Sequence, residues 1–173
     1  MNNVIYLVTG AAGFLGSNIC TQLLERGERV RAFVLEGDKA AKFLPERVVV
    51  FYGNLCDKAS LLPFFSVEQG VKTICIHVAS MVTVNPYYRK TVLDVNVGGT
   101  ENIVDMCLEH KECEKLVYVG STGGIPELPH GEKIKEIAEV NLDKVEGWYS
   151  KSKAMVTNNV FTAEKNRGLK ACV

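Results

Sequence analysis

Tyr149 and Lys153 are the residues whose types and spacing most directly suggest chemistry. They stand four positions apart in the sequence Tyr-Ser-Lys-Ser-Lys, and on a helix residues at this spacing lie on the same face. A phenol alone has a pKa of ~10 and is a poor acid or base at neutral pH. A lysine ammonium beside it favours the phenolate, so the pair could move a proton. The same spacing arises by chance in many helices, so its meaning depends on the elements that position it.

A second chemical signal is the glycine-rich segment TGAAGFLG at residues 9–16. Gly10 permits a tight turn, Gly13 lets the backbone approach a pyrophosphate, and Gly16 lets a helix pack closely on a strand. The N-terminus of the helix that follows offers unpaired N–H groups and the positive end of its dipole to phosphates. The segment predicts a dinucleotide-binding turn. The alternative is a glycine-rich turn that binds nothing.

The elements around these motifs alternate between short apolar runs and stretches of helical period. Apolar runs predict strands at residues 4–8, 30–35, 48–52, 73–79, 116–119 and 169–173. Helical patterns begin at Phe14 and stop at Gly27, and recur over residues 92–110 and 148–165. Alternation of this kind implies parallel strands joined by right-handed crossovers. We therefore expect an α/β fold, a doubly wound Rossmann-type parallel sheet with helices on both faces.

The chain fits one domain better than two, because its 173 residues can bury a single good core. Its last residues look like the opening of a sixth strand, so we expect residues 1–173 to be an incomplete domain, truncated at that strand. Residues 123–147 are the exception to the alternation. They carry two prolines, several glycines and many charges, which indicates a surface excursion with at most one short helix.

Composition narrows the classes of function. The 20 basic and 20 acidic side chains give a net charge of zero, which provides no electrostatic footprint for nucleic acid or an anionic membrane. The apolar runs are far too short to span a bilayer, and no basic region precedes the first strand, so a signal peptide is not expected. The six cysteines form no C-x-x-C pair. We interpret them as free thiols in a reducing cytoplasm, and no metal site is expected.

The spacing T-G-x-x-G-x-x-G begins a resemblance that runs along the whole chain. It resembles that of the extended short-chain dehydrogenase/reductases, which include sugar-nucleotide epimerases and dehydratases, dihydroflavonol reductases and 3β-hydroxysteroid dehydrogenases. Three further segments are similar to motifs of this family: GNLCD at residues 53–57, HVAS at 77–80 and NVGGT at 96–100. The resemblance implies an NAD(P)-binding domain whose substrate-binding part lies outside this sequence.

The resemblance also implies which residues bind the cofactor. They are Gly10, Gly13, Phe14, Leu15, Gly16, Asn54, Leu55, Ala79, Asn96, Tyr149 and Lys153. Asn54 stands where the family has an acid that contacts the adenine; it can still hydrogen-bond an amino group but carries no charge. His77 is interpreted as a structural residue at a strand end rather than a base. Asn96 corresponds to an asparagine that supports the active site.

A catalytic trio of Ser121, Tyr149 and Lys153 follows from the same resemblance. Ser121 comes just after the fifth predicted strand and would hydrogen-bond the reacting oxygen, with Thr122 as a possible substitute. Tyr149 would pass that oxygen a proton, and Lys153 would hold the ribose and tune Tyr149. The cofactor would carry the hydride, so the protein's task is placement and electrostatics.

The choice between NAD and NADP is open at this stage. Val34 and Leu35 stand at the end of the second strand, where an acid favours NAD and an arginine favours NADP. Glu36 and Asp38 are close enough to repel a 2′-phosphate, whereas two nearby lysines could attract one. We lean slightly to NAD.

Three functions remain after this reading. The first is an NAD(P)-dependent oxidoreductase that transfers a hydride between nicotinamide and the carbonyl or hydroxyl of a small organic substrate. The second is a sugar-nucleotide epimerase or dehydratase. The third is a non-catalytic nucleotide-binding sensor or scaffold. The resemblance further implies a homodimer through the helices at residues 92–110 and 148–165, whose apolar positions could equally be core.

Overall fold

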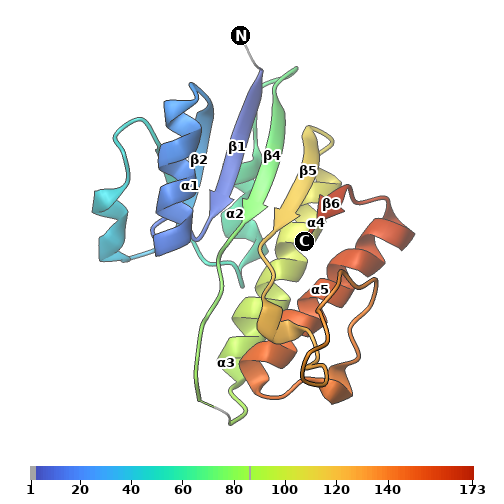
Figure 1. Ribbon diagram of the computed structural model, residues 1–173. Helices are drawn as coiled ribbons and strands as arrows, with labels where there is room; N and C mark the ends of the chain where they lie inside the picture. The colour runs from blue at the N-terminus through green and yellow to red at the C-terminus, as the bar shows by residue number, and fades with distance from the viewer. Residues whose placement is uncertain (1–2, 86) are drawn as a thin grey trace.

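The computed structural model describes residues 3–85 and 87–173. Within them six parallel strands form one sheet in the order β3-β2-β1-β4-β5-β6 (Figure 1). The strands are β1 (Val4–Thr9), β2 (Arg29–Leu35), β3 (Val49–Gly53), β4 (Lys72–His77), β5 (Cys113–Tyr118) and β6 (Ala171–Cys172). This confirms the predicted α/β class and doubly wound sheet, with differences of a few residues at strand ends.

The order of the strands creates a switch point between β1 and β4. The chain moves outward from β1 through β2 to β3 and then returns to the other side of β1, where β4 pairs with it from Val4↔Lys72 to Thr9↔His77. Open parallel sheets bind ligands beyond the carboxyl ends of the strands at such a reversal. The glycine-rich segment begins at this point, directly after β1.

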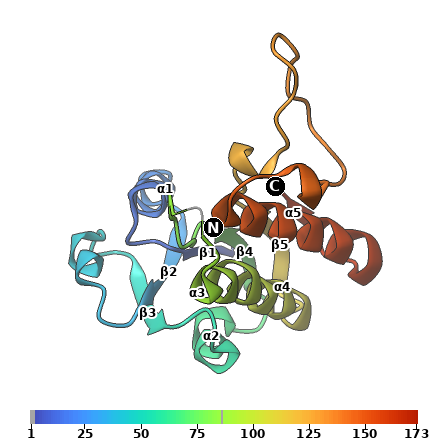
Figure 2. The ribbon, with the colours of Figure 1, turned by 90° about the horizontal axis from the view of Figure 1, so that it is seen from below.

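One face of the sheet is covered by three helices: α2 (Lys58–Phe65), α4 (Gly99–Glu109) and α5 (Trp148–Arg167). Figure 2 shows α2 and α4 together on one side of the sheet, with α1 on the other. The main core lies between this face and the helices. Its fully buried side chains include Leu61, Phe64 and Phe65 from α2, Ile103 and Met106 from α4, and Val156 and Val160 from α5. Because α2 contains only eight residues and an internal proline, it was not among the predicted helices.

The second face is covered differently. Among the described residues, α1 (Phe14–Glu25) is the α-helix that packs there, over β1 and β2. Its Cys20 and Leu24 meet Val8, Val30 and Ala32 in a smaller core. Helices therefore lie on both faces, as predicted, but in unequal number.

The long helix predicted over residues 92–110 is interrupted. It consists of α3 (Lys90–Leu93), a π-helical turn (Asp94–Gly98) and α4. A π turn inserts one extra residue into a helix and occurs frequently at functional sites. The insertion carries Asn96, which is 2% exposed.

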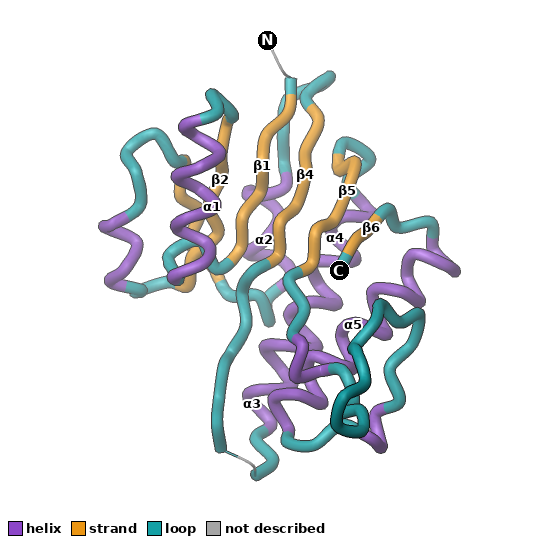
Figure 3. Tube along the Cα trace, in the orientation of Figure 1, coloured by secondary structure: helices purple, strands orange, loops and turns teal. Residues whose placement is uncertain are grey.

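The excursion predicted over residues 123–147 is largely irregular (Figure 3). Two single 3₁₀ turns lie at its ends, Thr122–Gly124 and Leu142–Lys144. The last part of this excursion packs on α5, where Val140 and Val145 contact Ala154. The Asn158 side chain also accepts from the Val140 N–H and donates to the Val140 carbonyl. In the part of the chain that is described, no helix has both the length and the apolar character needed to cross a membrane.

Candidate active site at the carboxyl edge of the sheet

The glycine-rich turn has the close packing that its sequence predicts. Gly10 adopts φ +64°, and a Cβ placed on it would lie 2.7 Å from both Cα and N of Ala79. A Cβ on Gly16 would collide with the carbonyl oxygen of Gly10. The Gly13 N–H donates to the same oxygen over 3.0 Å. The turn therefore leaves no room for side chains at Gly10 and Gly16.

The first turn of α1 faces this segment without a side-chain cap. Gly13 occupies the N-cap position and has no side chain to offer. The N–H groups of a first helical turn lack partners within the helix, and together with the helix dipole they attract an anion. Phe14, which is 90% exposed, and Leu15 stand at the surface beside it. The turn and the helix start thus fit a pyrophosphate.

A cavity of about 460 Å³ opens over these residues. It spans the carboxyl ends of β1, β2, β3 and β4. Eight of the residues predicted to bind cofactor line it: Gly10, Gly13, Phe14, Leu15, Gly16, Asn54, Leu55 and Ala79. We call this cavity and its eight predicted residues the nucleotide end. The cavity lies across the switch point, where open parallel sheets bind ligands.

The rim of the nucleotide end beyond β2 carries one carboxylate that the prediction had only considered as a repulsive charge. Asp38 lines the cavity together with Val34 and Leu35. Its Oδ1 accepts a hydrogen bond of 2.9 Å from the Ala40 N–H, which fixes the side chain at the start of a 3₁₀ helix, Lys39–Phe43. Asn54 is similarly held, since its Oδ1 accepts from the Cys56 N–H.

Ser121, Tyr149 and Lys153 lie beyond the end of β5. We call them the catalytic end after the role predicted for them, which stays a prediction. The Lys153 ammonium donates to the Val119 carbonyl over 2.8 Å and lies 4.6 Å from the centre of the Tyr118 ring. Gly123 lies between Ser121 and the first turn of α5, because a Cβ built on it would lie 3.5 Å from Ser121 Oγ and 3.2 Å from Ser150 Oγ. Ser121 Oγ accepts from the Gly123 N–H.

Burial shapes the electrostatics of the catalytic end. Lys153 is 3% exposed, and burial lowers its pKa to about 8. Tyr118 is almost fully buried, and burial, followed by the influence of Tyr149, raises the pKa of its phenol. Sequence reasoning missed Tyr118, whose position in β5 matched that of an ordinary core residue. The Tyr118 ring stacks on the His77 ring, with centroids 5.9 Å apart. The Lys153 ammonium lies over the same Tyr118 ring.

Asn96 links the two ends rather than lining the cavity. Its Oδ1 accepts from the Met81 N–H over 2.7 Å and from Ser80 Oγ, and its Nδ2 donates to the Met81 carbonyl and to Ser152 Oγ. Met81 lines the nucleotide end, and Ser152 lies in α5 between Tyr149 and Lys153. Asn96, Tyr149 and Lys153 are not among the residues that line the cavity, although all three were predicted to bind cofactor.

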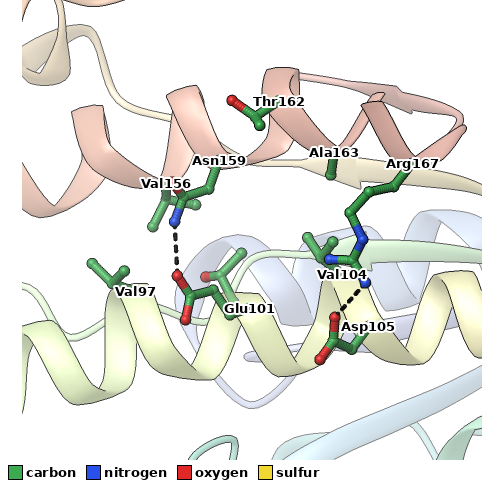
Figure 4. A pocket seen from close by; sticks show the side chains of 10 residues that line it. Val97, Glu101, Val104, Asp105, Val156, Asn159, Thr162, Ala163 and Arg167 are labelled. Atoms are coloured by element: carbon green, nitrogen blue, oxygen red, sulfur yellow. Dashed lines mark hydrogen bonds and ion pairs between the residues drawn. The ribbon is translucent and has the colours of Figure 1, made fainter. Parts of the chain in front are cut away.

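A separate cavity of about 340 Å³ lies between α4 and α5 (Figure 4). A hydrogen bond and an ion pair join the two helices across this cavity. Asn159 donates to Glu101 over 2.9 Å, and Arg167 pairs with Asp105 over 2.8 Å. Figure 4 shows these two contacts reaching from one helix to the other. This is the surface of the predicted dimer contact, which stays a prediction.

Metal-binding clusters are absent from residues 3–85 and 87–173, where no group of three or more His, Cys, Asp or Glu side chains could hold an ion. The six cysteines are all free thiols. Cys20 is fully buried, and burial raises its pKa to about 11. Thiols of this kind are poor metal ligands and poor nucleophiles at neutral pH.

The strand order, the glycine turn at the switch point and the cavity above it define a Rossmann-type nucleotide-binding domain. The profile of the 3-beta hydroxysteroid dehydrogenase/isomerase family matches residues 7–172. The chain therefore belongs to this family, one of the extended short-chain dehydrogenase/reductases.

Similar proteins include steroid enzymes and an epimerase. A sterol demethylase protein B from Methylococcus capsulatus is 34% identical over 125 residues, which cover 72% of this chain and 37% of that protein. A 3 beta-hydroxysteroid dehydrogenase/Delta 5→4-isomerase from Mycobacterium tuberculosis is 32% identical over 149 residues, which cover 76% of this chain and 38% of that protein. The UDP-glucose 4-epimerase of Thermus thermophilus in complex with NAD is 28% identical with a TM-score of 0.78, covering 97% and 53%. The chain thus spans less than half the length of these curated relatives and about half of the solved one.

Proposed function

We propose that this chain is the cofactor-binding part of an NAD(P)-dependent dehydrogenase or reductase acting on a carbonyl or hydroxyl group of a small organic substrate. The observation that carries the proposal is the placement of two ends at one sheet edge. A glycine turn with no room for side chains at Gly10 and Gly16 lies with its cavity beyond β1, and Tyr149 and Lys153 lie beyond β5. Asn96 connects them through Met81 and Ser152.

The bound nicotinamide dinucleotide would supply the hydride. Gly10, Gly16 and the start of α1 would hold its pyrophosphate, because they leave space and offer backbone N–H groups. Tyr149 would donate a proton to the substrate oxygen in the reducing direction, and Ser121 would orient that oxygen. Lys153 would supply positive charge near Tyr149, since it is buried and held in place by the Val119 carbonyl and the Tyr118 ring.

The preferred cofactor in this proposal is NAD. Asp38 places a fixed carboxylate on the rim of the cavity, beyond β2, where a ribose 2′-hydroxyl can donate to it and a 2′-phosphate is repelled. The similar Thermus thermophilus epimerase is in complex with NAD. Fluorescence titration with NADH and NADPH tests the preference, and equal affinity for the two would remove it.

The reaction class is tested with the product of the complete gene. A reductase or dehydrogenase consumes or forms NADH in proportion to substrate, whereas an epimerase leaves no net change in cofactor. The steroid enzymes among the similar proteins favour a steroid-type hydroxyl or ketone as substrate, and the similar epimerase keeps a sugar nucleotide as the second candidate. Steady NADH oxidation with a ketosteroid supports the reductase or dehydrogenase. Turnover of UDP-glucose without net NADH oxidation supports the epimerase.

The proposal also covers the rest of the protein, its compartment and its oligomeric state. The substrate-binding part would be encoded outside residues 1–173, the six free thiols would suit a reducing cytoplasm, and two copies would pair through α4 and α5. The intact mass of the complete gene product tests the first point. Sedimentation of that product, with Arg167→Glu as a variant that reverses a charge on the groove, tests the last.

A further inference from the structure

Three buried polar side chains stand one behind another under the glycine-rich turn. Thr9 Oγ1 lies 2.6 Å from His77 Nδ1, and His77 Nε2 lies 2.9 Å from Thr100 Oγ1. Their exposed fractions are 0%, 1% and 3%. Buried polar atoms must find partners within the protein, so the direction of each hydrogen bond here can be worked out from its neighbours.

The directions follow from the far end of the row. The Thr100 hydroxyl donates to the Asn96 carbonyl over 2.6 Å, because a carbonyl can only accept. Its oxygen must therefore accept from His77, which places the imidazole proton on Nε2. His77 Nδ1 is then bare and accepts from the Thr9 hydroxyl, whose oxygen in turn accepts from the Ala79 N–H over 3.3 Å. Every group is satisfied in this single arrangement.

The row continues to the catalytic end. The residue that receives the last bond, Asn96, donates through its side chain to Ser152 Oγ over 3.0 Å. Ser152 Oγ donates to the Tyr149 carbonyl over 2.6 Å. A connected path thus runs from the Ala79 N–H, beside Gly10, to the first turn of α5.

We propose that His77 is a positioning residue, which in its neutral, Nε2-protonated form couples the glycine-rich turn to the helix turn that carries Tyr149. The inference rests on the proposed function, because it assigns the coupling to cofactor binding. Ordering of the glycine turn by a dinucleotide is transmitted through Thr9, His77 and Thr100 to Asn96 and α5. His77 touches no reacting atom and acts through the residues that do.

A second proton on His77 would break the row. Nδ1–H would point at Thr9 Oγ1, so the Thr9 hydroxyl hydrogen would lose Nδ1 as its acceptor. The groups that face the ring from other elements are Tyr118 of β5 and Lys153 of α5. Neither carries a negative charge at neutral pH, and burial followed by the Lys153 charge lowers the pKa of His77 to about 3. The neutral form is therefore kept across the physiological range.

The hydrogen positions are tested by NMR of the chain with ¹⁵N-labelled histidine. His77 is expected to show a protonated Nε2 and a bare Nδ1, with no titration between about pH 5 and pH 8, the span in which an ordinary imidazole titrates. His77→Gln identifies the His77 signals among those of the three histidines. A proton on Nδ1, or titration of His77 within that range, would overturn the proposal.

The coupling is tested by amide hydrogen exchange with and without NADH. Thr100→Val removes the link between His77 and Asn96, and Ser152→Ala removes the last link without touching the buried threonines. Thr73→Val is the matched control, since Thr73 is equally buried and its hydroxyl makes no hydrogen bond within the usual limits. In the native chain and the control, NADH is expected to slow exchange both at residues 14–17 and at residues 150–153.

In Thr100→Val and Ser152→Ala, protection at residues 14–17 should persist, while the NADH effect at residues 150–153 falls by roughly fivefold or more, the lower end of typical coupling between sites. Full retention of the effect in Ser152→Ala would overturn the coupling. A chain that binds no NADH contradicts the proposed function and with it the coupling, while the NMR result still decides whether the row of hydrogen bonds is as deduced.

Discussion

The nucleotide end and the catalytic end are built in different ways. At the nucleotide end, residues 10–16 supply five of the eight predicted lining residues within one turn, and their backbone does the shaping. At the catalytic end, Ser121 follows β5 whereas Tyr149 and Lys153 belong to α5. Hydrogen bonds to the backbone and the contact of Lys153 with the Tyr118 ring hold the Ser121 and Lys153 side chains in place. The first depends on local conformation and the second on long-range packing, so substitutions should affect them separately.

The largest expected effect is at the catalytic end. Tyr149→Phe removes only the hydroxyl of a half-buried ring, so turnover by the complete gene product should fall by about 10²–10⁴, the usual contribution of a positioned general acid. Stability should stay unchanged, and NADH affinity should change far less than turnover. Tyr118→Phe is the matched control, because it keeps the ring between His77 and Lys153. Equal losses in both variants would show that Tyr149 has no special role.

Gly10→Ala should break the nucleotide end instead. Its Cβ would lie 2.7 Å from the Ala79 backbone at φ +64°, and strain of this kind costs about 1–3 kcal/mol. We expect NADH affinity to fall by roughly tenfold to a hundredfold. Gly27→Ala has a similar positive φ but nothing within 4 Å of its Cβ. Gly27→Ala should lower stability in urea unfolding while leaving NADH affinity intact. Loss of NADH binding in both Gly10→Ala and Gly27→Ala would contradict the idea that the collision with Ala79 is what weakens binding.

Lys153 offers a test through pH. Burial lowers its pKa from an ordinary 10.5 to about 8, so between these values the unfolded chain binds more protons than the folded one. The free energy of unfolding gains a contribution as pH rises from about 8 to 10.5, and lacks it below pH 8. Lys153→Met should remove this part of the pH dependence, measured as the difference between the two proteins in urea unfolding. Parallel pH profiles would contradict the buried position of the ammonium.

The smallest effect is expected at the rim. Asp38→Asn removes a partly solvated charge, so the preference for NADH over NADPH should shrink by about two- to fivefold, as for other exposed charges. Glu36→Gln, which changes a charge outside the cavity lining, is the control. Fluorescence titration with NADH and NADPH measures the ratio of the two affinities. A larger change of this ratio in Glu36→Gln than in Asp38→Asn would show that Asp38 does not determine the preference.

The nucleotide end could be predicted because its signal is contiguous. Glycines at fixed spacing between an apolar run and a helical pattern specify a turn whatever lies elsewhere in the chain. The parallel, doubly wound sheet followed from the alternation of apolar runs and helical patterns along the chain. The prediction extended β4 to Ala79, whereas the strand ends at His77, because Val78 and Ala79 remain apolar after the ladder stops.

The links between the ends could not be predicted, because they join residues far apart in the sequence. The helical period over residues 92–110 does not reveal the single inserted residue that forms the π turn and places Asn96. Alternation in β5 indicates that Tyr118 faces inward, but not that its ring stands between residues 77 and 153. Lys153 was predicted to hold a ribose, and its bond to the Val119 carbonyl depends on how α5 packs against the end of β5.

Titration of the chain with NADH, followed by energy transfer from Trp148, tests most directly whether the two ends form one cofactor site. Trp148 is the single tryptophan of the sequence and precedes Tyr149 in α5. Saturable quenching of Trp148, with matching sensitised nicotinamide emission that unlabelled NAD reverses and Gly10→Ala weakens, is the expected result. Absence of saturable transfer, with the chain folded by circular dichroism, would contradict a nicotinamide dinucleotide site at this edge of the sheet.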